Sequence, residues 1–81
     1  MLKVEYKGRE KTNFRNKPNL YVHHLDVATD AESMTIFTEN GVRIDKKVRK
    51  PVHHFYIPDV KAGAGWIVVK AGNESMEVQT E

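Results

Sequence analysis

Cysteine is absent from this 81-residue chain, and its absence removes two common sources of stability in small domains. No disulfide can form, and the structural zinc sites that are built on thiolates are excluded. A domain of this size buries only about 60–65% of the surface that its unfolded chain exposes. We therefore expect a single domain of modest stability that depends on the packing of its apolar core.

Long hydrophobic runs are also absent. No apolar stretch approaches the roughly 18–20 residues that a membrane-spanning helix requires. Residues 1–6 lack the apolar segment and the small-residue cleavage site of a secretory signal peptide. We therefore expect a cytoplasmic protein with no membrane partner.

A large excess of either charge is missing, although the charges are unevenly distributed. The chain has 13 basic and 11 acidic residues, which is a small excess for a nucleic-acid-binding protein. Residues 18–42 contain no Lys or Arg, whereas residues 43–50 contain five basic side chains. This block could bind a partner, or it could be a solvated edge strand that prevents aggregation. The candidate binding residues are Arg43, Lys46, Lys47, Arg49, Lys50 and Trp66.

The residues that are present predict an all-β fold. Short runs of β-branched and aromatic residues alternate with Gly, Pro, Asn and Asp, and no segment shows a helical stripe with recognisable caps. We expect residues 1–81 to form one domain of about seven short, mainly antiparallel strands in a small sandwich. An SH3-like or OB-like barrel is the alternative. The expected strands are 2–6, 10–14 after a turn at Lys7-Gly8, 20–29, 34–39, 42–46, 52–57, 66–70 and 75–79.

Two hairpins are predicted from turn chemistry. Asn40-Gly41 lies between apolar runs and favours a two-residue turn, because both residues accept a positive φ. That turn would place Phe37 opposite Ile44, on the face that also carries Thr35 and Val42. A second hairpin is expected through a four-residue loop, residues 71–74, with Trp66 as a plug at the end of the core or as a partner anchor. Its expected core pairs are Ile67 with Val78 and Val69 with Met76.

All four histidines lie in two similar segments thirty residues apart. Val22-His23-His24-Leu25 is echoed by Val52-His53-His54-Phe55. Because strand residues alternate between faces, His23 and His53 should face the core. The opposite faces carry His24, Asp26, His54 and Tyr56, and these four converge if the two strands are neighbours.

Three chemistries suit these four residues. Two histidines and Asp26 could hold zinc with a water in the fourth position. The histidines could act as general acid and base on a phosphodiester, with Tyr56 beside them. One histidine, oriented by Asp26, could form a pH-sensitive contact. No compact metal or nucleophile motif accompanies them, so ordinary packing and hydrogen bonding is preferred, and no metal or cofactor is expected.

The sequence favours a non-enzymatic binding module over an enzyme, because so small a β domain has little volume for a substrate pocket. We expect the partner to be a protein or a second copy that adds to an exposed strand edge. Nucleic-acid binding by a β-barrel and a small hydrolase that uses His24, Asp26 and His54 are the alternatives. No small-molecule substrate is indicated. By analogy, the small size and the lack of motifs are typical of accessory proteins of phages and mobile elements.

Overall fold

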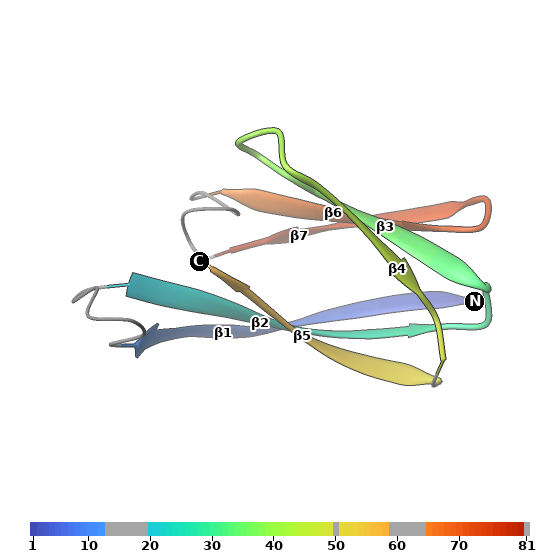
Figure 1. Cartoon of the computed structure of the whole chain (residues 1–81), viewed down its shortest axis with the longest axis horizontal. Helices are drawn as coiled ribbons and strands as arrows, with labels where there is room; N and C mark the ends of the chain where they lie inside the picture. The colour runs from blue at the N-terminus through green and yellow to red at the C-terminus, as the bar shows by residue number, and fades with distance from the viewer. Residues whose placement is uncertain (13–19, 50, 59–64, 81) are drawn as a thin grey trace.

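Seven antiparallel strands form two sheets in the computed structural model, which describes residues 1–12, 20–49, 51–58 and 65–80 (Figure 1). One sheet has the order β1-β2-β5 and the other the order β4-β3-β6-β7. The two sheets are not closed into a barrel, so the expected small sandwich is confirmed and the barrel alternative is wrong. The strands are β1 (Leu2–Thr12), β2 (Leu20–Thr29), β3 (Ser33–Thr38), β4 (Arg43–Lys47), β5 (Val52–Pro58), β6 (Trp66–Ala71) and β7 (Glu74–Gln79).

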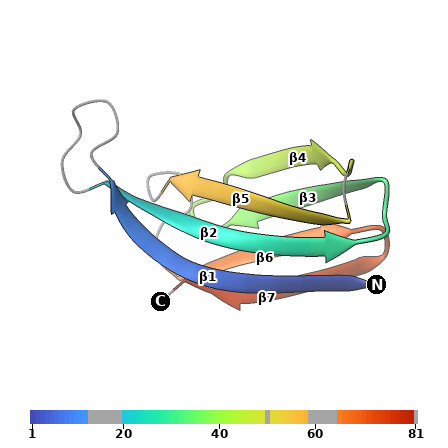
Figure 2. The same cartoon turned by 90° about the horizontal axis from the view of Figure 1, so that it is seen from below.

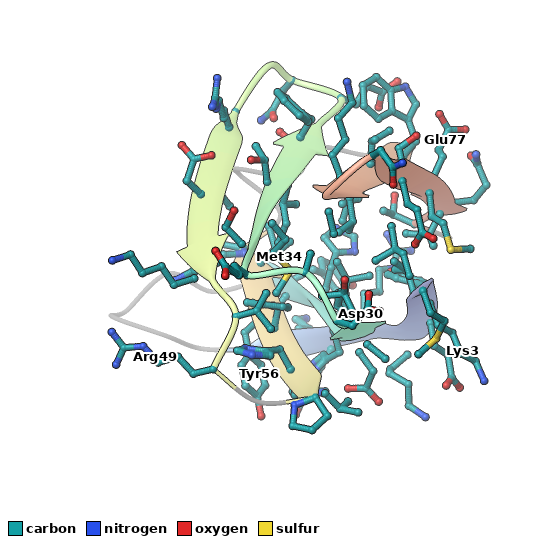
Figure 3. The ribbon with its side chains drawn as sticks, turned by 90° about the vertical axis from the view of Figure 1, so that its right-hand side faces the viewer. Lys3, Asp30, Met34, Arg49, Tyr56 and Glu77 are labelled. Carbon is teal, nitrogen blue, oxygen red and sulfur yellow. The ribbon has the colours of Figure 1, made fainter. Side chains whose placement is uncertain are left out.

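The apolar core lies between the two sheets, where the inward side chains of alternating strand positions meet. Figure 3 shows Met34 between the layers, whereas Glu77 and Lys3 lie on the outside. Among the described residues, none forms a helix that could cross a membrane. The buried apolar residues are Val4, Leu25, Val27, Met34, Ile36, Ile57, Ile67, Val69 and Ala71.

The first strand corrects one expectation. The turn predicted at Lys7-Gly8 is wrong, because β1 runs without interruption from Leu2 to Thr12. The pairing of β1 with β2 shifts between Tyr6 and Gly8, and Gly8 has a φ of 103°. Gly8 therefore marks a β-bulge, in which one extra residue bends the strand without ending it.

The first hairpin also differs from the expected register. Ile36 lies opposite Ile44, and Phe37 lies opposite Arg43, which is one residue away from the predicted pairing. The amide of Gly41 donates to the carbonyl oxygen of Thr38 at 3.0 Å, and Gly41 has a φ of 87°. The loop thus has three residues with glycine in the left-handed position, another common hairpin solution. As a result Ile36 and Ile44 face the core, and Phe37 faces outward.

The second hairpin has the predicted register. Ile67 pairs with Val78 and Val69 with Met76, although Ala71 and Glu74 also pair and shorten the loop to Gly72-Asn73. Ile67 and Val69 are buried, whereas 38% of Met76 is exposed. The core assignment is therefore correct for β6 but not for Met76.

The two sides of the sandwich differ. β1 contacts β7 on one side, whereas the edge strands on the other side are β5 and β4 (Figure 2). Two hydrogen bonds join Thr80, after β7, to Gly65, before β6. The Gly65 amide donates to the Thr80 hydroxyl, and the Thr80 amide donates to the Gly65 carbonyl oxygen, both at 2.8 Å. The sandwich is thus held together differently on its two sides.

Candidate functional site

The paired histidine segments are adjacent strands of one sheet. β2 and β5 are antiparallel neighbours, with Asp26 opposite His54 and His24 opposite Tyr56. All four side chains lie on the outer face, because their neighbours in sequence face the core. His24 Nδ1 lies 3.2 Å from His54 Nε2, and His54 Nδ1 donates to Asp26 Oδ1 at 2.5 Å. The structure therefore brings together the four residues that the sequence singled out.

A fifth residue, Glu10, completes the cluster. His24 Nε2 donates to Glu10 Oε2 at 3.1 Å, so a continuous chain of hydrogen-bonding groups runs Glu10–His24–His54–Asp26. The sequence interpretation missed Glu10 because it placed a turn at Lys7-Gly8. The signal was Gly8 itself, since an isolated glycine in a strand pattern also indicates a bulge.

The central contact of this network brings two ring nitrogens face to face. An ionised carboxylate only accepts hydrogen bonds, so the ring nitrogens beside Glu10 and Asp26 must both carry protons. A neutral imidazole has a single ring proton, which would leave His24 Nδ1 and His54 Nε2 as two acceptors facing each other.

The same geometry limits the chemistry that was expected of these residues. Every ring nitrogen of His24 and His54 already has a partner within the network, which leaves none directed at a substrate. Asp26 contacts the far nitrogen of His54, away from the nitrogen that faces His24. In the described part of the chain, no group of three or more His, Cys, Asp or Glu could hold a metal ion, so Asp26 is not placed as a third zinc ligand.

Tyr56 forms the wall beside the two rings. Its ring meets those of His24 and His54 edge-on, with centroids 4.7 and 4.8 Å away. Tyr56 is nevertheless 65% exposed, because β5 is an edge strand (Figure 3). It is therefore the most exposed ring of the cluster.

The other two histidines face inward, as predicted. His23 is 1% exposed, and its Nδ1 lies 2.8 Å from the Tyr6 hydroxyl. His53 stacks on Phe55 with centroids 5.7 Å apart, and its Nε2 accepts from the Arg49 amide at 3.2 Å. These two rings are structural parts of the sandwich.

A cleft of mixed apolar and polar lining opens beside the network, between β4 and β5. Its volume is about 420 Å³. Ile44 and Phe55 are only partly buried there, although both pack against the core. The cleft is lined by Ile36, Ile44, Lys46, His54, Phe55, Tyr56, Ile57 and Pro58.

The candidate basic residues do not form a single surface. Lys46 shares the inner side of β4 with Ile44 and lines the cleft, whereas Arg43 and Lys47 alternate to the outer side. Arg43 Nε donates to Asp45 Oδ1 at 3.3 Å. Arg49 is exposed just after β4, and Lys50 lies outside the described residues.

Trp66 lies on the outer face of the four-stranded sheet, and the expectation that it plugs the core is wrong. It is half-buried and is not among the residues that pack on the core. Together with Phe37 and Val68 it lines a shallow depression of about 400 Å³. Lys70 Nζ lies 5.3 Å from the centroid of the Phe37 ring, a cation–π contact. This patch is on the opposite face from the histidine network.

One titration can be predicted from the hairpin β3–β4. The Thr35 hydroxyl donates to Asp45 Oδ1 at 2.8 Å, and this hydrogen bond, with Arg43 adding to it, lowers the pKa of Asp45 below its ordinary value. Thr35→Val should raise that pKa back towards the ordinary value, because the donor is lost. Carboxyl ¹³C shifts followed by NMR across an acid titration measure it. An unchanged Asp45 titration would contradict the assigned cause.

A lowered carboxyl pKa has a definite consequence for stability. The unfolded state holds the Asp45 proton more tightly, so the contribution is present above the ordinary carboxyl pKa. It is lost as the pH falls through the lowered value. Since Asp45 is exposed, the contribution is small.

Comparisons of the chain with protein-family models, with curated proteins and with solved structures find no match.

Proposed function

We propose that this protein is a non-enzymatic binding module that takes up an extended segment of another protein along the free edge of β5. Main-chain hydrogen bonds to the edge would supply affinity, and side chains that enter the cleft between β4 and β5 would supply selectivity. The proposal depends on one observation, which is the absence of protecting charges from this edge.

Natural sheets guard their edges with charged side chains, above all lysine. The four edge strands here are β1, β5, β4 and β7. β1 carries six Lys, Arg, Asp or Glu residues, β4 carries four and β7 carries two. β5, with the sequence VHHFYIP, carries none, and its Val52 and Tyr56 are 55% and 65% exposed. β5 is thus the edge best suited to accept another strand.

The surroundings of the cleft indicate what kind of segment fits. Apolar side chains, Ile44 and Phe55 among them, form part of its lining. Lys46 lines it, and Lys47 and Arg49 are exposed nearby in the sequence. An extended segment that alternates apolar and acidic residues would place the apolar ones in the cleft and the acidic ones beside these cations.

The two alternative functions have less support. A hydrolase would need a free ring nitrogen on His24 or His54, and all of them are partnered within the network. A nucleic-acid surface would need the basic side chains on one face, whereas Lys46 and Arg43 point to opposite sides of β4.

Selection of displayed linear peptides tests the proposal. We expect the wild-type protein to enrich peptides with alternating apolar and acidic residues, and synthetic versions of them to bind in a fluorescence-polarisation titration. Tyr56→Lys should weaken binding at least about tenfold, because it places a protecting charge on the edge. The matched control is Met76→Lys on the edge strand β7, which should bind like the wild type.

Three results would overturn the proposal. Equal binding by Tyr56→Lys would place the peptide elsewhere. Failure to enrich any sequence class would remove the extended-segment partner. A concentration-dependent dimer in analytical ultracentrifugation that Tyr56→Lys abolishes would show that a second copy occupies the edge instead.

A further inference from the structure

We propose that a transition-metal ion with imidazole affinity, Cu²⁺ or Zn²⁺, binds between Nδ1 of His24 and Nε2 of His54. This site lies on the outer face of the three-stranded sheet and is independent of strand addition at β5. The starting point is the central contact of the network, where two ring nitrogens face each other 3.2 Å apart. A metal ion placed there would accept a lone pair from each nitrogen.

The spacing of the two nitrogens suits a shared metal ion. Metal–nitrogen bonds of about 2.0–2.1 Å at a tetrahedral angle place two ligand nitrogens about 3.3 Å apart. His24 Nδ1 and His54 Nε2 are 3.2 Å apart. The ion would sit beside the line joining them, so both rings must tilt slightly. The His54 side chain is 40% exposed, which leaves it room to do so.

The carboxylates already stand where a metal-binding histidine needs them. A ligating imidazole commonly donates its other ring N–H to a carboxylate, which fixes the ring orientation and raises its basicity. Glu10 does this for His24 at 3.1 Å, and Asp26 does it for His54 at 2.5 Å. Both histidines therefore direct the nitrogens of their mutual contact, His24 Nδ1 and His54 Nε2, to the same point, where an entering ion would replace that contact.

Charge also favours an ion at this point. Glu10 and Asp26 are acidic side chains within hydrogen-bonding distance of the two rings, and negative charge there favours a cation nearby. Only two protein ligands bind directly, so the remaining coordination positions stay open to water on the exposed side. Cu²⁺ should bind more tightly than Zn²⁺, following the usual order for nitrogen sites.

Isothermal titration of the whole chain with CuSO₄ and with ZnCl₂ at pH 7.5 tests the site. We expect one saturable ion per chain, with affinity reduced at least about tenfold in both His24→Asn and His54→Asn because one of two ligands is lost. Asp26→Asn should lower affinity by about 10–100-fold through the loss of the orienting carboxylate. The matched control is His53→Asn, since His53 belongs to the same dipeptide but faces inward.

A second measurement avoids dependence on variants that fail to fold. Zn²⁺ added to ¹⁵N-labelled wild type should shift His24 Nδ1 and His54 Nε2 and leave the His23 ring unchanged. Titrations in two buffers of different ionisation enthalpy should also show release of a proton as the ion enters. Absence of saturable binding, binding that survives in His24→Asn, or loss of binding only in His53→Asn would each overturn the site. The peptide titration is a separate readout, so either proposal can fail alone.

Discussion

Leu25→Ala should lower the free energy of unfolding by about 2–5 kcal/mol, the range for truncating a buried leucine. Leu25 is 0% exposed and lies in β2, the central strand of its sheet, so the surrounding side chains cannot easily close the cavity. Small domains have total stabilities of about 5–15 kcal/mol, so this one change removes a large fraction. Urea unfolding followed by circular dichroism measures the loss.

Met76→Ala is the matched control, because it removes a side chain of similar size from an exposed position. It should change the free energy of unfolding by no more than about 0.5 kcal/mol. A Leu25→Ala loss as small as that of the control would mean that Leu25 is not packed between the sheets.

Gly41→Val should lower the free energy of unfolding by about 1–3 kcal/mol, the usual strain of a side chain held in the left-handed region. Gly41 has a φ of 87°, and a Cβ added there would meet nothing within 4 Å. The effect would therefore come from the backbone and not from a clash. Thermal unfolding of the variant and the wild type gives the difference.

Gly41→Asn separates backbone conformation from side-chain size. Asparagine tolerates the left-handed region far better than valine, so this variant should keep most of the stability. Equal losses in both variants would contradict the argument from φ.

Alternation along single strands was the part of the fold that the sequence could predict. His23, Leu25 and Val27 are buried as expected, since the period of two is a local property. The register of the hairpin β6–β7 was also predictable, because it is fixed by pairing within one short segment.

The errors arose where one local signal allows two backbone solutions. Asn40-Gly41 suits a two-residue turn, yet the same glycine also serves as the left-handed residue of a three-residue loop. Lys7-Gly8 suits a turn as well as a bulge. In both places the choice depends on which alternative buries more apolar surface, and that depends on strands elsewhere in the chain.

The histidine network could be predicted only conditionally. The alternation of strand residues between two faces predicted the polar faces that carry His24, Asp26, His54 and Tyr56. These side chains converge only because β2 and β5 pair. Nothing in the residues between these strands fixes that pairing. The contact of Glu10 with His24 could not be predicted from the sequence, because it depends on the continuation of β1 past Gly8.

The sheet order has a kinetic consequence. The hairpins β3–β4 and β6–β7 close through short loops, and such hairpins form in about 1–10 μs. The pairings of β2 with β5 and of β3 with β6 join strands that are separated by long segments of the chain. A chain dominated by such distant pairings should fold on a timescale of about milliseconds to seconds. During that interval β5, which carries no charge from Lys, Arg, Asp or Glu, is exposed without its partner. This strand is where crowded nascent chains would first associate wrongly.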